Sequence, residues 1–263
     1  MKMGVISDIR PFRMYGNLYF VGSTRVSVHI LKTEEGLVMI DSGYPDMFDI
    51  ICDSMEKVGL SPKDLCAIIH THGHIDHTGT TLRFKKLSGA KTYISRIDND
   101  IINGKKDLSW AKELKYEKQE EFDCDVLLED GDILTFGTTS IRFASTPGHT
   151  EGTMSFFVDL CEKGKKITAA MHGGAGLNTL SEKYLEQNGL PLDLRDAYKQ
   201  SITKLSSEKV DLVLGNHPQQ NDTSGKGGKV LLGESIIDPS EWNKFLDFHR
   251  KALDDLIEKE KTI

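Results

Sequence analysis

Four side chains that can bind a metal ion fall within six consecutive residues, 72–77, which read His-Gly-His-Ile-Asp-His. They come shortly after the apolar run 65–69, which the pattern predicts to be a buried strand. The first two histidines alternate like side chains on an extended backbone, and the aspartate and last histidine enter the next element. A strand-to-helix turn could therefore aim all four at one point. Neutral imidazole and carboxylate suit zinc. A polar loop rich in histidine by chance is the alternative, but the whole chain has only nine histidines.

Two more histidines follow predicted strands farther along the chain. A proline and a glycine fix a tight turn immediately before His149, in the run Thr-Pro-Gly-His-Thr at 146–150. His217 comes shortly after the apolar run 210–214, so a buried strand again presents a histidine at its carboxyl edge. A lone histidine is more often a core residue than a ligand. These two become candidate ligands because the metal-binding cluster precedes them.

The elements that must position these residues alternate strands with helices, which is typical of a layered α/β domain. Runs of β-forming or buried apolar residues predict strands over 17–21, 25–31, 37–43, 65–69, 91–94, 126–128, 133–136, 140–144, 153–158, 166–170 and 210–214. Apolar residues at helical spacing predict helices that begin at Pro45, Thr78 and Asp193, and a closing amphipathic helix over 239–260.

Residues 96–125 interrupt this order with a charged stretch that predicts a helical excursion. Its charges favour a solvated helix, while Trp110 and Tyr116 are candidates for a wall over the metal site. The excursion is therefore expected to face the substrate through these two aromatic residues. The glycine-rich run 224–229 lacks the spacing of a P-loop and is expected to be a flexible loop.

Composition limits the class of protein. A chain of 263 residues that is 38% apolar can bury one sizeable α/β core, and we expect a single domain over 1–263. The formal charge of -7 disfavours a nucleic-acid partner, because phosphate binding needs a concentrated basic surface. No run is apolar enough to predict a membrane span, and the first residues show no signal-peptide pattern, so we expect a cytoplasmic location. The four cysteines lie far apart and are interpreted as reduced thiols.

These motifs together resemble those of the metallo-β-lactamase superfamily of binuclear zinc hydrolases. The resemblance rests on the His-x-His-x-Asp-His and Thr-Pro-Gly-His-Thr runs, an Asp-x-Gly at 41–43 and the His-Pro at 217–218. The pattern is most similar to the third subclass of metallo-β-lactamases. It implies a four-layer αββα sandwich.

The same resemblance implies a cofactor of two zinc ions, with iron or manganese as alternatives. One ion would be held by His72, His74 and His149, and the other by Asp76, His77 and His217. Asp41 is expected to brace the metal site without binding the metal, and a turn- or helix-capping role is the alternative.

His172 departs from the commonest family pattern, which has a metal-bridging aspartate at this place and, in some β-lactamase subclasses, cysteine or serine. Three interpretations are open: a replacement ligand, a group that supports the ligands or faces the substrate, or a residue without a chemical role. Each imidazole nitrogen has one lone pair and bridges two metals poorly, which favours the second interpretation.

The resemblance implies a zinc-dependent hydrolase in which a metal-bound hydroxide attacks a carbonyl carbon, as in a β-lactamase. Asp76 is the candidate catalytic residue, because it can carry a proton to the leaving group as well as bind metal. A lactonase or a thioesterase similar to hydroxyacylglutathione hydrolase is the alternative, and a zinc-binding module without catalysis is a third. A phosphoesterase acting on nucleic acid would show a basic face or an added domain, and a di-iron oxidoreductase would show Glu in place of His74. We therefore expect a small-molecule substrate and no nucleic-acid or membrane partner.

Overall fold

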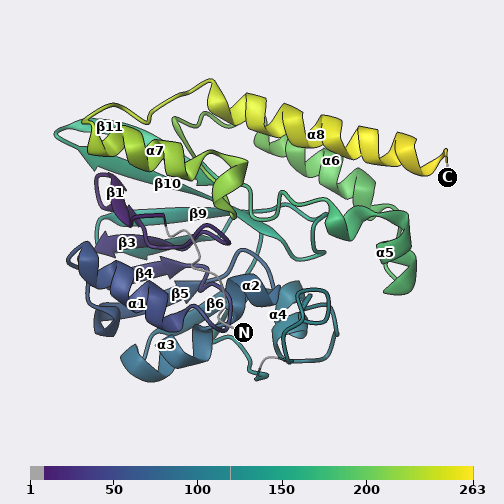
Figure 1. The fold of residues 1–263 in the computed structure, drawn as a ribbon, viewed down its shortest axis with the longest axis horizontal. Helices are drawn as coiled ribbons and strands as arrows, with labels where there is room; N and C mark the ends of the chain where they lie inside the picture. Colours follow the sequence, from purple (N-terminus) through teal and green to yellow (C-terminus); the bar gives the residue numbers. More distant parts are fainter. Residues whose placement is uncertain (1–8, 119, 263) are drawn as a thin grey trace, which may run out of the picture.

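The computed structural model describes residues 9–118 and 120–262, and two β-sheets lie face to face within them, with helices outside (Figure 1). This arrangement is the four-layer αββα sandwich that the sequence predicts. The strands of the first sheet come from the first half of the chain, and those of the second sheet follow. Each sheet is therefore built from a continuous part of the sequence.

The first sheet runs in chain order from β1 to β7. Its strands are β1 (Phe12–Tyr15), β2 (Leu18–Phe20), β3 (His29–Thr33), β4 (Gly36–Ile40), β5 (Leu65–Ile69), β6 (Lys91–Ser95) and β7 (Val126–Leu128). The strands from β1 to β4 pair antiparallel, and those from β4 to β7 pair parallel. Because β4 and β5 are parallel neighbours, their carboxyl ends meet at one edge of the sheet.

The second sheet has the order β12-β11-β10-β9-β8. Its strands are β8 (Ile133–Phe136), β9 (Thr139–Ser145), β10 (Met154–Glu162), β11 (Lys165–Met171) and β12 (Leu212–Leu214). The pairs from β8 to β11 are antiparallel, whereas β12 lies parallel to β11. The carboxyl ends of β11 and β12 therefore lie side by side.

Helices form the two outer layers of the sandwich (Figure 1). The α-helices are α1 (Phe48–Lys57), α2 (Ile75–Thr78), α3 (Thr81–Ser88), α4 (Arg96–Ile102), α5 (Glu182–Gln187), α6 (Leu194–Leu205), α7 (Thr223–Leu231) and α8 (Glu241–Glu260). Short 3₁₀ turns occupy Pro62–Asp64, Asn178–Leu180 and Pro218–Gln220.

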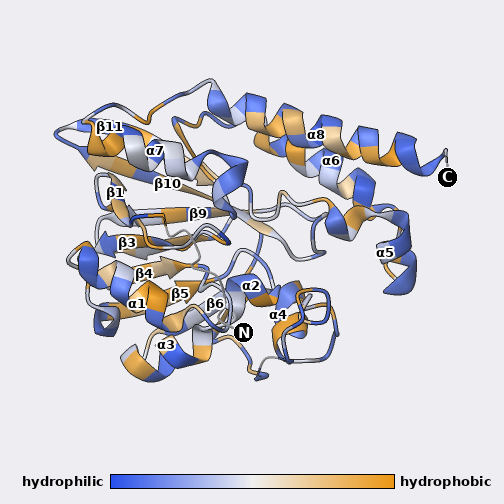
Figure 2. Ribbon diagram, in the orientation of Figure 1, coloured by the Kyte–Doolittle hydropathy of each residue, from blue (hydrophilic) through white to orange (hydrophobic). Residues whose placement is uncertain are grey.

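Clusters of buried apolar residues hold the layers together, three of them large, and Figure 2 shows the apolar residues gathered on the strands. The core between the sheets contains residues such as Phe20 and Phe156. A second core packs Phe84 of α3 and residues of α1 against the outer face of the first sheet. A third packs Tyr198 of α6 and Trp242 of α8 against the second sheet. The faces of the sheets that pack in these cores carry the apolar residues whose pattern predicted the strands.

The predicted charged helix within 96–125 is mostly wrong. Among the residues of this stretch that the structure describes, 96–118 and 120–125, only those of α4 are helical, and turns follow α4. Trp110 and Lys115 both have a positive φ, at 61° and 60°, which a right-handed helix does not permit. The strand predicted over 25–31 also begins later than expected, at His29.

The predicted flexible loop over 224–229 is wrong as well, because these residues form most of α7. Asp222 caps this helix by accepting a hydrogen bond from the N–H of Gly225 at 3.1 Å. Gly227 lets the helix approach Phe12 of β1, since a Cβ there would lie 3.0 Å from the Phe12 ring. Tertiary packing therefore overrides the low helix propensity of glycine.

Within the residues described, no helix is long and apolar enough to span a bilayer.

Candidate metal centre

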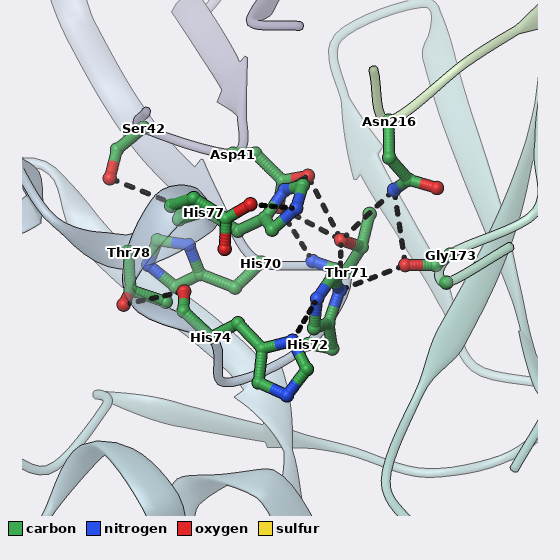
Figure 3. Close-up of polar contacts among 12 residues, drawn as sticks. Asp41, Ser42, His70, Thr71, His72, His74, His77, Thr78, Gly173 and Asn216 are labelled. Carbon is green, nitrogen blue, oxygen red and sulfur yellow. Dashed lines mark hydrogen bonds and ion pairs between the residues drawn. The ribbon is translucent and has the colours of Figure 1, made fainter. Parts of the chain in front are cut away.

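The predicted ligands lie on the segments that leave the strands where the two sheets meet. The segment after β5 bends at residues 71–73, so it does not continue the extended backbone that the sequence predicts there; His74 is extended, and α2 then carries Asp76 and His77. His149 follows β9, and His217 follows β12. Figure 3 shows the first of these side chains beside Asp41, at the end of β4, and Asn216. Together they form two groups, each with its candidate ligand atoms within 4.8 Å of one another: a first group of His72, His74 and His149, and a second group of Asp76, His77 and His217.

In the first group, three ring nitrogens point at one spot. The Nδ1 of His74 lies 3.1 Å from the Nε2 of His72 and 3.1 Å from the Nε2 of His149. The opposite nitrogens, Nδ1 of His72 and of His149, donate to the carbonyls of Gly173 at 2.9 Å and Gly176 at 2.7 Å. With these donor assignments both Nε2 atoms carry lone pairs, and a single proton on His74 can satisfy only one of them.

These distances fit a metal ion. Tetrahedral zinc with Zn–N bonds of about 2.0–2.1 Å separates its nitrogen ligands by about 3.3 Å. A hydrogen bond from the remote ring nitrogen to a carbonyl is the usual way to fix the tautomer of a metal-binding histidine. The donor set of the first group therefore suits zinc.

The second group adds a carboxylate to two imidazoles. The Oδ2 of Asp76 lies 3.4 Å from the Nε2 of His77 and 3.5 Å from the Nε2 of His217. The Nδ1 of His217 donates to the carbonyl of Arg25 at 2.7 Å, so its Nε2 faces the cavity. The same division of roles between the two ring nitrogens appears in both groups.

Asp41, which the resemblance implies as a brace of the metal site, contacts the second group. Its Oδ2 accepts a hydrogen bond from the Nδ1 of His77 at 2.8 Å, and its Oδ1 accepts one from the backbone N–H of Thr71 at 2.8 Å. Its φ of 56° places it in the left-handed region, where aspartate and asparagine are among the residues best tolerated. The side chain is 1% exposed. Thr71, which the sequence did not single out, is thus part of the site.

Asn216 links the two sheets behind the first group and was also missed. Its amide donates to the carbonyl of Gly173 at 3.0 Å, the same carbonyl that holds the His72 ring (Figure 3). The backbone carbonyl of Asn216 accepts from the N–H of Ser27. The signal available in the sequence was its place directly before His217.

The environment keeps the first group unprotonated at neutral pH. Burial and the neighbouring imidazoles lower the pKa of His72 and of His74, and burial lowers that of His149 to about 4. In the second group burial opposes ionisation, but the carboxylates of Asp76 and Asp41 outweigh it and raise the pKa of His77 to about 10. The second group is therefore a strongly cation-attracting site, and a metal ion binding there displaces a proton.

The six candidate ligands form the floor of a cavity of about 320 Å³. Trp110 lines it, with its ring centroid 5.8 Å from that of His74, as the sequence predicted. Tyr44 forms another part of the wall, and the guanidinium of Arg25 lies 3.9 Å from its ring centroid. Tyr116 does not line the cavity but stacks behind Tyr44, at 5.5 Å between ring centroids.

His172 does not face the cavity, which corrects the substrate-facing interpretation. It is fully buried, and its ring lies against that of Tyr198, 5.5 Å between centroids. Its Nδ1 accepts a hydrogen bond from the N–H of Gly174 at 3.2 Å. The side chain therefore stands behind the loop 173–176, whose residues from Gly174 to Gly176 line the cavity. What remains of the prediction is support of that loop.

Comparison with known proteins agrees with this geometry. The model of the metallo-beta-lactamase superfamily matches residues 21–161. An uncharacterized protein of Aquifex aeolicus (strain VF5) is 33% identical over 224 residues, which cover 82% of this chain and 96% of that protein. The chain belongs to the metallo-β-lactamase superfamily, and it is a metal-dependent hydrolase.

Solved structures share the whole fold. Native FEZ-1 metallo-beta-lactamase from Legionella gormanii has a TM-score of 0.87 and 26% identity, covering 99% of this chain and 100% of that one. BJP-1, a subclass B3 metallo-beta-lactamase of Bradyrhizobium japonicum, has a TM-score of 0.88 and 24% identity, covering 98% and 97%. Hydroxyacylglutathione hydrolase of Maricaulis maris (strain MCS10) is 27% identical over 112 residues, which cover 43% of this chain and 35% of that enzyme.

Proposed function

We propose that this protein holds two zinc ions and hydrolyses a carbonyl substrate, with a β-lactam as the first candidate. The observation that carries the proposal is the convergence of ligand atoms into two adjacent groups on the floor of one cavity. Each group supplies three protein ligands, which leaves coordination positions open for water and substrate, as in catalytic zinc sites.

Different residues of the chain would orient the metal ligands and position the substrate in such a reaction. Bound zinc supplies a Lewis acid that lowers the pKa of water to about 7 and polarises a carbonyl oxygen. The carbonyls of Gly173, Gly176 and Arg25 orient the histidines. Trp110 and Tyr44 form walls that restrict how a substrate lies over the floor.

Asp76 is proposed to move a proton as well as bind the second ion. Burial favours its neutral form, but His77 and His217 outweigh burial and lower the pKa of Asp76, so it is ionised at neutral pH. Its carboxylate lines the cavity: Oδ2 faces the two imidazoles, and the other oxygen can accept a proton from the water molecule that attacks the substrate and pass it to the leaving group. Asp76→Ala should reduce turnover by about 100-fold or more, and full activity with both metals retained would contradict the role.

The choice of substrate class follows from the relatives. Two metallo-beta-lactamases match over nearly the whole of both chains, which supports a β-lactam. A thioester or lactone is the second candidate, supported by hydroxyacylglutathione hydrolases among the relatives. That match spans only about a third of the curated enzyme, so it supports the thioesterase less strongly.

One purification tests the proposal. Zinc per chain is measured first, and the protein is then assayed on a chromogenic cephalosporin, an S-acyl glutathione thioester, a lactone and a phosphodiester. We expect two zinc ions per chain and fastest turnover of the cephalosporin. Faster thioester or lactone turnover would establish the second candidate instead. Bound zinc without turnover of any substrate would establish the non-catalytic module. Iron or manganese in place of zinc remains an alternative, and a single domain and a cytoplasmic location remain predictions of the sequence.

A further inference from the structure

Asp98 is a fully buried carboxylate in the first turn of α4, away from the six candidate ligands. Its Oδ2 accepts hydrogen bonds from the backbone N–H of Gly73 at 2.9 Å and from the hydroxyl of Thr150 at 2.7 Å. Its Oδ1 accepts a third from the N–H of Gly152 at 2.9 Å. Gly73 lies between two histidines of the first group, and Thr150 directly follows the third. One carboxylate thus joins the two loops that carry the first group.

Both loops approach α4 so closely that only glycine fits at the contact. A Cβ at Gly73 would lie 2.8 Å from the Cβ of Ile101, and a Cβ at Gly152 would lie 2.4 Å from the Oδ1 of Asp98. The position of Asp98 is itself held, because the hydroxyl of Ser95 caps α4 by accepting the N–H of Asp98 at 3.1 Å. The first turn of α4 therefore has one fixed position against both loops.

The charge of Asp98 is held without a cation in hydrogen-bond contact among the residues described. The nearby Lys106 pairs instead with Glu151, at 2.7 Å. Burial raises the pKa of Asp98 to about 6, although the hydrogen bonds from the two loops oppose that rise. A buried carboxylate without a cation lowers stability unless its hydrogen bonds are satisfied, and here three donors from two loops satisfy it. A neutral amide could not accept all three, since one of its two polar atoms is a donor.

We propose that Asp98 is a positioning residue that fixes the loop 72–77 against the loop 146–152 and so sets the distances among the three nitrogens of the first group. The proposal rests on the proposed function, because it gives Asp98 a role in metal binding. The bonds from His72 to Gly173 and from His149 to Gly176 orient the rings, whereas Asp98 fixes the backbone from which those rings project.

The test replaces Asp98 by an isosteric amide and measures zinc binding to the first group alone. Asp98→Asn is made in a His217→Ala background, in which the second group lacks a ligand, and zinc affinity is measured by competition with a chromogenic chelator. We expect a 10- to 100-fold loss of affinity, the effect usual for partners behind metal ligands. Asp123→Asn is the matched control. Asp123 is exposed and accepts hydrogen bonds from the side-chain amides of Asn99 and Asn103, and none from either loop.

A second measurement does not depend on metal. Amide hydrogen exchange of the metal-free chain should be at least tenfold faster in the peptides that contain Gly73 and Gly152 in Asp98→Asn, and unchanged there in Asp123→Asn. A role in stability alone would lower the melting temperature without changing the zinc affinity of the folded protein. Equal zinc affinity with and without Asp98→Asn would therefore overturn the proposal.

Thr150 supplies variants for the case in which Asp98→Asn does not fold. Thr150→Val removes one of the three hydrogen bonds and should weaken zinc binding several-fold, whereas Thr150→Ser keeps the hydroxyl and should restore it. Equal zinc affinity for these two variants would also overturn the proposal. The failure of the proposed function is recognised separately, since the wild-type chain would then bind no zinc or would hydrolyse no carbonyl substrate.

Discussion

Replacing Asp41 by asparagine tests the reasoning about the second group most directly. The substitution preserves shape, and asparagine tolerates the left-handed backbone at this position, where φ is 56°. Asp41 receives the Nδ1–H of His77 on one oxygen and the N–H of Thr71 on the other. Asparagine has one oxygen, so either the His77 ring or the Thr71 N–H must face an NH₂ group.

The expected magnitude follows from that mismatch. The ring of His77 can avoid the NH₂ group by moving its proton to Nε2, but Nε2 is the atom that faces Asp76 and the metal position. Losing a buried hydrogen bond to a charged group costs about 1.5–3 kcal/mol. Since each 1.4 kcal/mol is a factor of ten, we expect zinc affinity at the second group to fall about 10- to 100-fold. The first group should keep its affinity, because Asp41 makes no hydrogen bond to its rings.

Zinc content after dialysis against a chelator, followed by competition titration, measures both effects. Wild type should retain two zinc ions at a chelator concentration at which Asp41→Asn retains one. Asp49→Asn is the control, because Asp49 is an exposed aspartate on α1 that pairs with Arg83 at 3.4 Å and is neither a candidate ligand nor a lining residue of the cavity. Two ions held with unchanged affinity by Asp41→Asn would refute the assignment of Asp41 as the partner that fixes His77.

Three further outcomes are expected. His149→Ala should lose one of the two zinc ions by elemental analysis, with hydrolysis reduced at least 100-fold; two tightly held ions would contradict the first group. Trp110→Ala should raise KM about tenfold with zinc content unchanged, as measured by steady-state kinetics, and an unaltered KM would remove Trp110 from the substrate wall. The pKa of Asp98 is about 6 in the folded protein against about 3.9 unfolded, so its contribution to stability is full below pH 4 and is lost as the pH rises through 6. The free energy of unfolding of the metal-free chain, measured with urea relative to Asp98→Asn, should therefore decrease by about 2 kcal/mol between pH 4 and pH 7, and a difference that stays flat would contradict this pKa.

The sequence by itself determined most of the strands and the two groups of candidate ligands. The apolar run 65–69 coincides with β5, and Asp76 and His77 lie on the next element, α2, as predicted. These features depend on hydrophobic periodicity and turn chemistry, which act between near neighbours in the chain and are therefore visible in it. The resemblance of the motifs to those of a known family then predicted which distant segments supply ligands to the same metal ion, which no local pattern could have done.

Only the tertiary structure decided how those segments meet. His172 turns away from the cavity and packs on Tyr198, and Gly227 lets the helix α7 approach β1. Asp98 lies on α4, and the sequence pattern of this helix does not predict that Asp98 accepts hydrogen bonds from two separate loops. A buried polar group takes its partners from whichever segments fold around it, and those partners lie too far apart in the sequence to leave a periodic signal.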